Sequence, residues 1–67
     1  MKFEEYAHVR IIRNNVMGVI IHMYQTKEGT YRYTIESDEE GPIDDPGAWN
    51  DVRFPQFICD EDEIELV

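Results

Sequence analysis

The chain has 67 residues, with 15 acidic side chains, 6 basic side chains and one cysteine, and these counts exclude several classes of protein. A chain this short buries only roughly 60% of the surface that its unfolded form exposes, so residues 1–67 are expected to form one domain. The single cysteine, Cys59, excludes an internal disulfide and a Cys-x-x-Cys pair. So small a core leaves little room for an enclosed active site, which favours a protein that is not an enzyme.

The ends and hydropathy of the sequence indicate a compartment. Glu4 and Glu5 stand where a signal peptide carries positive charge, and no run of about 18 apolar residues occurs. Together with the single cysteine, this predicts a reduced, soluble, cytoplasmic protein with no membrane partner.

Charge is uneven along the chain. Residues 1–35 hold five basic and three acidic side chains, a balance of +2, whereas residues 36–67 hold one basic and twelve acidic side chains, a balance of −11. The second half therefore concentrates negative potential, which repels phosphates, so direct nucleic-acid binding is not expected. Two interpretations follow: the acids keep a small domain soluble, or they form a face that docks on a basic partner.

The first half of the chain predicts strands. Residues 6–12 alternate, with Val9 and Ile11 on one side and His8 and Arg10 on the other, as in a half-buried strand. The asparagine pair that follows predicts a tight turn, because asparagine tolerates positive φ.

The next two segments predict a hairpin. Residues 16–24 are rich in β-branched and aromatic side chains, which predicts the central strand, with a helix as the competing interpretation. Gly18 indicates a bulge or a close backbone crossing. In residues 30–36 alternate positions are apolar, so this segment is expected to pair with the preceding strand across a short polar connection.

The middle of the second half predicts an exposed loop. Residues 38–47 combine prolines and glycines with five acidic side chains, which is typical of a long loop without regular structure. Residues 48–55 predict the start of a fourth strand that Pro55 interrupts or ends near a sheet edge. A short apolar segment, residues 56–59, comes next.

The last residues predict a turn and a closing strand. Residues 60–63 suit a single helical turn capped by Asp60, since acidic side chains are favourable at a helix N-terminus. Residues 64–67 alternate as a strand. The chain therefore predicts one unit of about five short strands.

The order of these segments has two motif-like parts, Gly18 before a β-rich strand and the terminal Asp-Glu-Ile-Glu-Leu at residues 62–66. Over nearly the whole chain this order resembles the small SH3-like barrels of the KOW and Tudor-like type. The resemblance implies an all-β, strongly bent, five-stranded SH3-like barrel with a long acidic loop and a short helical turn before the last strand. Such families commonly bind protein or nucleic acid through loops and aromatic residues, which here implies Tyr31, Tyr33 and Trp49.

Residues that could carry chemistry are few. Cys59, His8 and His22 could act as nucleophile and base, but no signature of a catalytic cysteine surrounds Cys59, and its apolar neighbours predict a buried thiol. An EF-hand alignment that places Gly41 at loop position 6 puts Gly47 where the bidentate glutamate is required. No catalytic residue, metal site or cofactor is therefore expected.

Trp49 has two interpretations. The indole could fold back over an open end of the core, because it buries a large area. It could instead stand exposed between Asp45 and Asp51, where it would be a hot spot for a basic partner.

The sequence therefore predicts a non-enzymatic protein-binding module whose acidic face docks on a basic protein surface. The candidate partner-binding residues are Asp38, Glu39, Glu40, Asp44, Asp45, Trp49, Asp51 and Phe54. One alternative is an acidic inhibitor or nucleic-acid mimic, of phage or immunity type, that occupies a basic groove. The other is a structural subunit that forms a homo-oligomer through exposed strand edges.

Overall fold

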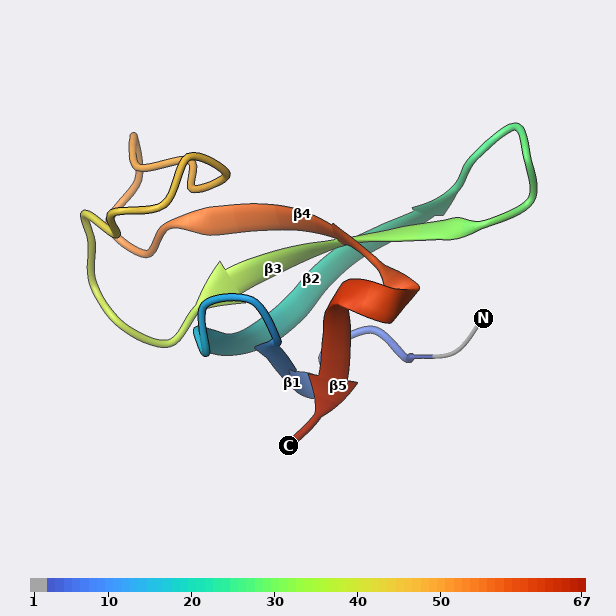
Figure 1. Cartoon of the computed structure of the whole chain (residues 1–67), viewed down its shortest axis with the longest axis horizontal. Coiled ribbons are helices and arrows are strands. Elements are labelled where there is room, and N and C mark those ends of the chain that lie inside the picture. Colours follow the sequence, from blue (N-terminus) through green and yellow to red (C-terminus); the bar gives the residue numbers. More distant parts are fainter. Residues whose placement is uncertain (1–2) are drawn as a thin grey trace.

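The computed structural model describes residues 3–67, which form one antiparallel sheet of five strands (Figure 1). Its elements are β1 (His8–Ile11), β2 (Met17–Gln25), β3 (Tyr31–Ser37), β4 (Gln56–Asp60), the 3₁₀ helix η1 (Glu61–Glu63) and β5 (Ile64–Leu66). The strand order β4-β3-β2-β1-β5 makes β2 the central strand and places β4 and β5 at the two borders. The prediction of an all-β chain with five strands is confirmed.

The sheet is sharply curled because η1 alone connects its two border strands. In a flat sheet, four strand spacings of about 4.8 Å would separate β4 from β5 by about 19 Å. Three residues of 3₁₀ helix rise only about 6 Å. β5 therefore lies close to the end of β4 and also pairs with β1, where Ile11 is opposite Ile64.

The core lies on the inner face of this curl, where the predicted alternation places it. Val9 and Ile11 of β1, Ile20 of β2, and Tyr33 and Ile35 of β3 are fully buried. Among the described residues the core is completed by Phe3, Val16, Phe57, Cys59 and Ile64. Phe3 packs edge-to-face on Tyr33, with 5.5 Å between the ring centroids.

The predicted turns are confirmed. After β1, Asn15 adopts φ 60°, the left-handed region that asparagine tolerates, and the side-chain oxygen of Asn14 accepts a hydrogen bond from the Val16 N–H at 3.0 Å. Between β2 and β3, the Thr26 and Thr30 hydroxyls bond to each other at 2.7 Å. These contacts stabilise the turn after β1 and the connection of the β2–β3 hairpin, both of which the sequence predicts.

For Gly18 the sequence predicts either a bulge or a close backbone crossing, and the structure confirms the second. The register of β2 against β3 shifts between Ile20 and His22, so the bulge falls at Ile21. Gly18 instead marks a close backbone approach: a Cβ there would lie 2.3 Å from the carbonyl oxygen of Glu36. Glycine is therefore required at this position for β2 and β3 to pair closely.

The fourth strand also begins later than predicted. Within residues 48–55 only Trp49 pairs with another strand residue, in an isolated bridge to Gln56. Pro55 lacks an N–H, but its carbonyl oxygen accepts a hydrogen bond from the Ser37 N–H at 2.8 Å. The regular ladder with β3 therefore starts at Gln56, and the segment read as a short apolar stretch is β4.

The predicted helical turn is η1. The N–H of Asp60 donates to the Glu63 side chain at 2.7 Å, the reach-back contact of a capping box. Within residues 3–67, no helix has the length and the apolar character needed to cross a membrane.

Candidate functional site

The outer face of β3 and β4 carries the candidate site. Phe57 and Cys59 of β4 point into the core, so the residues that alternate with them, Gln56, Ile58 and Asp60, point outward. They stand opposite Glu36, Thr34 and Arg32 of β3, respectively. Two hollows lie beside these outward residues, one at each end of β4.

The first, which we call the Trp49 hollow, lies at the start of β4. It has a volume of about 370 Å³ and is lined by Thr34, Gly47, Trp49, Gln56 and Ile58. Trp49 is held there by two backbone hydrogen bonds to Gln56, of 2.9 and 3.1 Å. With 55% of its surface exposed, the indole does not cover the core, so of the two interpretations only the exposed position agrees with the structure.

Ile58 is the functional candidate that sequence reasoning missed. Its side chain is 58% exposed beside Trp49, although it lies between two buried residues in an apolar run. In the structure Gln56, Ile58 and Asp60 alternate with buried neighbours. The sequence does not show this alternation clearly, because Phe57, Ile58 and Cys59 are all apolar.

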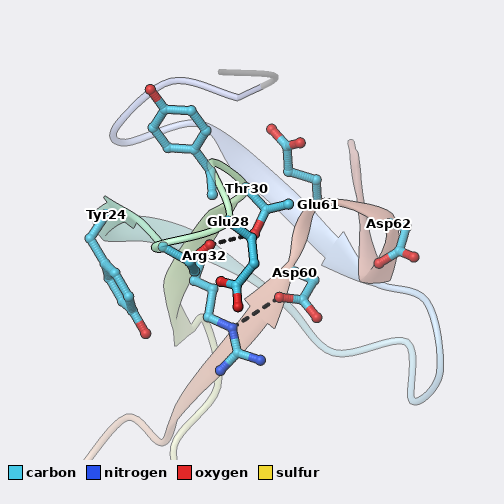
Figure 2. Close-up of a pocket in the computed structure, with 9 residues that line it drawn as sticks. Tyr24, Glu28, Thr30, Arg32, Asp60, Glu61 and Asp62 are labelled. Carbon is cyan, nitrogen blue, oxygen red and sulfur yellow. Dashed lines mark hydrogen bonds and ion pairs between the residues drawn. The ribbon is translucent and has the colours of Figure 1, made fainter.

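The second, the acidic hollow, lies where β4 ends. It measures about 660 Å³ and is lined by Tyr24, Thr26, Glu28, Thr30, Tyr31, Arg32, Asp60, Glu61 and Asp62. Figure 2 shows Arg32 between Tyr24 and Asp60, and the Arg32 Nε donates to the Asp60 carboxylate at 3.0 Å. The negative charge of Asp60 raises the pKa of Arg32, so the guanidinium stays charged. This hollow already contains a cation of its own.

Two of the predicted loop acids are bonded to other side chains of the molecule. Asp38 contacts the His8 Nε2 at 2.6 Å, which connects the end of β3 to β1. Glu40 accepts from the Arg53 guanidinium at 2.6 Å, across the base of the loop. The Glu40 carboxylate therefore presents less charge to a partner than the sequence suggests.

A third loop acid, Asp45, is structural. Its carboxylate accepts hydrogen bonds from the Arg13 guanidinium at 2.9 Å, the Asn14 amide at 2.8 Å and the Gly47 N–H at 2.8 Å. The bonds from Arg13, then Asn14 and Gly47, lower the pKa of Asp45 from 3.8 to about 2. Only 10% of this side chain is exposed, so Asp45 fastens the loop to the turn after β1.

The other predicted site residues divide into two groups. Glu39, Asp44 and Asp51 are exposed, and among residues 3–67 they have no ion-pair partner. Phe54 is half-buried, and the Arg53 guanidinium carbon lies 5.4 Å from the centroid of the Phe54 ring. Phe54 does not line the Trp49 hollow. The structure therefore brings Trp49 together with Ile58, not with Phe54.

The three aromatic residues implied by the family resemblance do not meet. Tyr33 is fully buried in the core, and its hydroxyl donates to Glu61 at 2.9 Å. Tyr31 lines the acidic hollow, and Trp49 lines the other one. No single aromatic cage is therefore formed by Tyr31, Tyr33 and Trp49.

The candidates for chemistry lie apart. Cys59 is 1% exposed, and this burial raises the pKa of its thiol to about 11, so it stays protonated near neutral pH. His8 contacts Asp38, while His22 is exposed beside Tyr24. In the part of the chain that the structure describes, no group of three or more His, Cys, Asp or Glu side chains is placed to hold a metal ion.

Comparison of the chain with protein families, with curated proteins and with solved structures found no match. Inferences about function therefore depend on the two hollows and the charges around them.

Proposed function

We propose that this protein is a non-enzymatic binding module with an SH3-like barrel fold, and that its acidic face docks on a basic surface of another protein. The strand order and the sharp curl between β4 and β5 support the barrel. The buried free thiol of Cys59, the only cysteine, supports a reducing, cytoplasmic compartment.

The exposed indole of Trp49 is the observation that carries the proposal. Binding energy concentrates in aromatic residues that a partner can desolvate, and tryptophan is the most enriched of them. Trp49 and Ile58 are each more than half exposed beside one hollow, and two backbone hydrogen bonds hold Trp49 in place. A rigid apolar anchor of this kind loses little conformational entropy when a partner binds.

The charge around this anchor specifies the partner. Asp44 and Asp51 lie close in sequence to Trp49, and Asp60 and Asp62 line the hollow at the other end of β4. Positive potential on a partner would speed encounter with this face and would disfavour acidic competitors. The proposed partner is therefore a protein surface that exposes an apolar side chain among lysines and arginines.

Two other functions from the sequence remain as competing proposals. An acidic mimic of nucleic acid needs carboxylates in a row along one face, whereas here they gather in the loop after β3 and around η1. A homo-oligomer has more support, because β4 and β5 are both sheet borders that a second copy could pair with. Molar mass measured by light scattering over a range of concentrations tests it: a constant monomer removes the homo-oligomer.

The docking proposal is tested with the fluorescence of Trp49, the only tryptophan. The free protein should emit at the long wavelength of a hydrated indole, and acrylamide should quench it readily. Titration with a lysine-rich peptide that carries one leucine should shift the emission to shorter wavelength and reduce the quenching. An emission maximum strongly shifted to the blue in the free protein would contradict the proposal.

Salt dependence provides the control. Raising the salt from about 0.05 M to about 0.5 M shortens the screening length several-fold, so association should slow markedly while dissociation changes little. A glutamate-rich peptide with the same leucine should not bind. Equal binding of both peptides, or association that salt does not affect, would contradict an acidic docking face.

A further inference from the structure

The free edge of β4 is open at one residue. Gln56 exchanges two hydrogen bonds with Trp49, so its N–H and C=O point away from β3. The N–H of Asp60 also points to that side, where it bonds to Glu63. Backbone groups alternate along an antiparallel strand, so those of Ile58 point the same way as those of Gln56 and Asp60. Within the described residues, no hydrogen bond pairs the outward N–H and C=O of Ile58.

This opening has defined limits. Trp49 occupies the edge before Ile58, and η1 turns the chain away after Asp60. In Figure 1, β4 lies along an outer border of the sheet, with the loop after β3 at one end and η1 at the other. An unpaired edge between two such limits is a template for one short strand from another molecule.

The side chains next to the opening select the added strand. Ile58 lines the Trp49 hollow, and Asp60 lines the acidic hollow, on the same outer face. Residues two apart on a strand lie about 6.7 Å from each other on one face. A strand added here would therefore place one side chain beside Trp49 and Ile58, and the side chain two residues along beside Asp60.

We propose that the β4 edge at Ile58 accepts an extended segment of the basic partner as an added strand. An apolar side chain of that segment would enter the Trp49 hollow, and a lysine or arginine two residues along would lie over the acidic hollow. The backbone of the apolar residue would exchange two hydrogen bonds with Ile58. This inference rests on the proposed docking function and adds how the partner binds and which sequence pattern it carries.

The test uses three blocked peptides of the same composition. In the first, valine and lysine occupy successive positions on one face of an extended chain, with threonine on the other face. In the second, valine and lysine are adjacent and so lie on opposite faces. The third is the first peptide with the valine nitrogen methylated, which removes the hydrogen-bond donor to Ile58. Affinity is measured by Trp49 fluorescence, and amide hydrogen exchange is measured on the isotope-labelled full chain.

We expect the first peptide to bind most tightly, and N-methylation to weaken binding about tenfold, in line with the loss of a buried hydrogen bond. In the free protein the Ile58 amide should exchange faster than those of Phe57 and Cys59, which face β3. Saturation with the first peptide should slow Ile58 exchange at least several-fold.

The contrary outcomes are distinguishable. If the peptides bind but N-methylation and Ile58 exchange show no effect, strand addition is wrong while docking on the acidic face stands. If neither these peptides nor the lysine-rich peptide binds, both proposals are wrong. If the free protein is a dimer with Ile58 already protected, a second copy occupies the edge and the proposed partner is wrong.

Discussion

The two hollows at the ends of β4 differ in the charge of the side chains that line them. The Trp49 hollow is lined by Trp49, Ile58 and three uncharged residues, and no charged side chain is among them. The acidic hollow is larger and is lined by four carboxylates, but Arg32 lies inside it and pairs with Asp60. A cation that enters the acidic hollow must compete with Arg32, whereas an apolar group that enters the Trp49 hollow meets no charged side chain in its lining.

This difference shows that acidic side chains alone do not define a binding site. Acidic side chains are frequent in the loop after β3 and around η1. Arg13, Arg32 and Arg53 nevertheless form ion pairs with several of them. The exposed apolar pair of Trp49 and Ile58 has no such internal partner to displace. We therefore expect affinity to depend on the Trp49 hollow, and association rate and specificity on the acids.

The largest effect should come from a change that displaces β3, because this strand contributes residues to both hollows. In Gly18→Ala the new Cβ would lie 2.3 Å from the Glu36 carbonyl oxygen, so β3 must move away from β2. We expect the free energy of unfolding to fall by about 3 kcal/mol, the upper part of the usual range for overpacking. Urea denaturation measures it.

The matched control is Gly29→Asn. Gly29 has φ 88°, a Cβ there would meet only the end of the Gln25 side chain at 3.8 Å, and asparagine tolerates positive φ, so the loss should be well under that of Gly18→Ala. Equal losses would show that the contact at Gly18 is not what requires glycine there.

The next largest effect should come from removing the indole of the Trp49 hollow. Trp49→Ala should weaken binding of the lysine-rich peptide about 30-fold, because truncating an aromatic hot spot costs about 2 kcal/mol or more. Isothermal titration calorimetry measures the affinity. Leu66→Ala, which removes another highly exposed apolar side chain from the opposite border, should leave the affinity unchanged. A similar loss in both variants would contradict a specific Trp49 hollow.

A smaller effect should come from emptying the acidic hollow. Arg32→Gln removes its internal cation, so the lysine-rich peptide should bind about threefold more tightly, as expected for an exposed charge pair. Arg10→Gln makes the same change in net charge beside Glu65, away from this face. If both variants gain equally, only the net charge matters and the acidic hollow has no role.

The last effect concerns pH and Asp45, whose carboxylate accepts a hydrogen bond from the N–H of Gly47 in the Trp49 hollow. The pKa of Asp45 is 3.8 ordinarily and about 2 in the fold, so between these values the unfolded chain binds more protons. Its stabilisation is therefore complete above about pH 4 and is lost as the pH falls towards about 2. We expect about 1 kcal/mol, since the partner Arg13 is 43% exposed and solvent screens the pair.

Urea denaturation from pH 7 to pH 2 measures this contribution. Asp45→Asn should be less stable than the parent at pH 7, and the difference should shrink on acidification. Asp44→Asn is the control, because Asp44 is exposed and has no ion-pair partner among the described residues. A difference for Asp45→Asn that does not change with pH would contradict the role of its carboxylate.

Most of the fold was predictable because alternation reports a buried face directly. Val9 and Ile11 in β1, and Tyr33 and Ile35 in β3, were predicted to face the core and are buried. The sequence pattern places the fourth strand too early: it predicts that Pro55 interrupts or ends this strand, whereas β4 begins directly after Pro55, at Gln56.

The site was less predictable because it depends on contacts across the chain. Nothing near Asp45 in sequence indicates that Arg13 neutralises it, and the alternation around Ile58 is hidden in an apolar run. The exposure of Trp49 depends on its bridge to Gln56, which forms only after the loop has folded back along β4. The local sequence pattern does not reveal contacts between residues that are far apart in the chain.

The short connection through η1 has a consequence for how this architecture can vary. Three residues must carry the chain from one border of the sheet to the other, and Glu63 both bonds to Asp60 and contacts Arg13, so an insertion would break these contacts. The segment between Ser37 and Gln56 is held at Asp45 and Trp49 but is otherwise an exposed loop, and the entropy of closing a loop rises slowly with its length. Diverged relatives should therefore keep a constant spacing across residues 56–66 and change length mainly between residues 38 and 55, where new binding specificities could be added without altering the sheet.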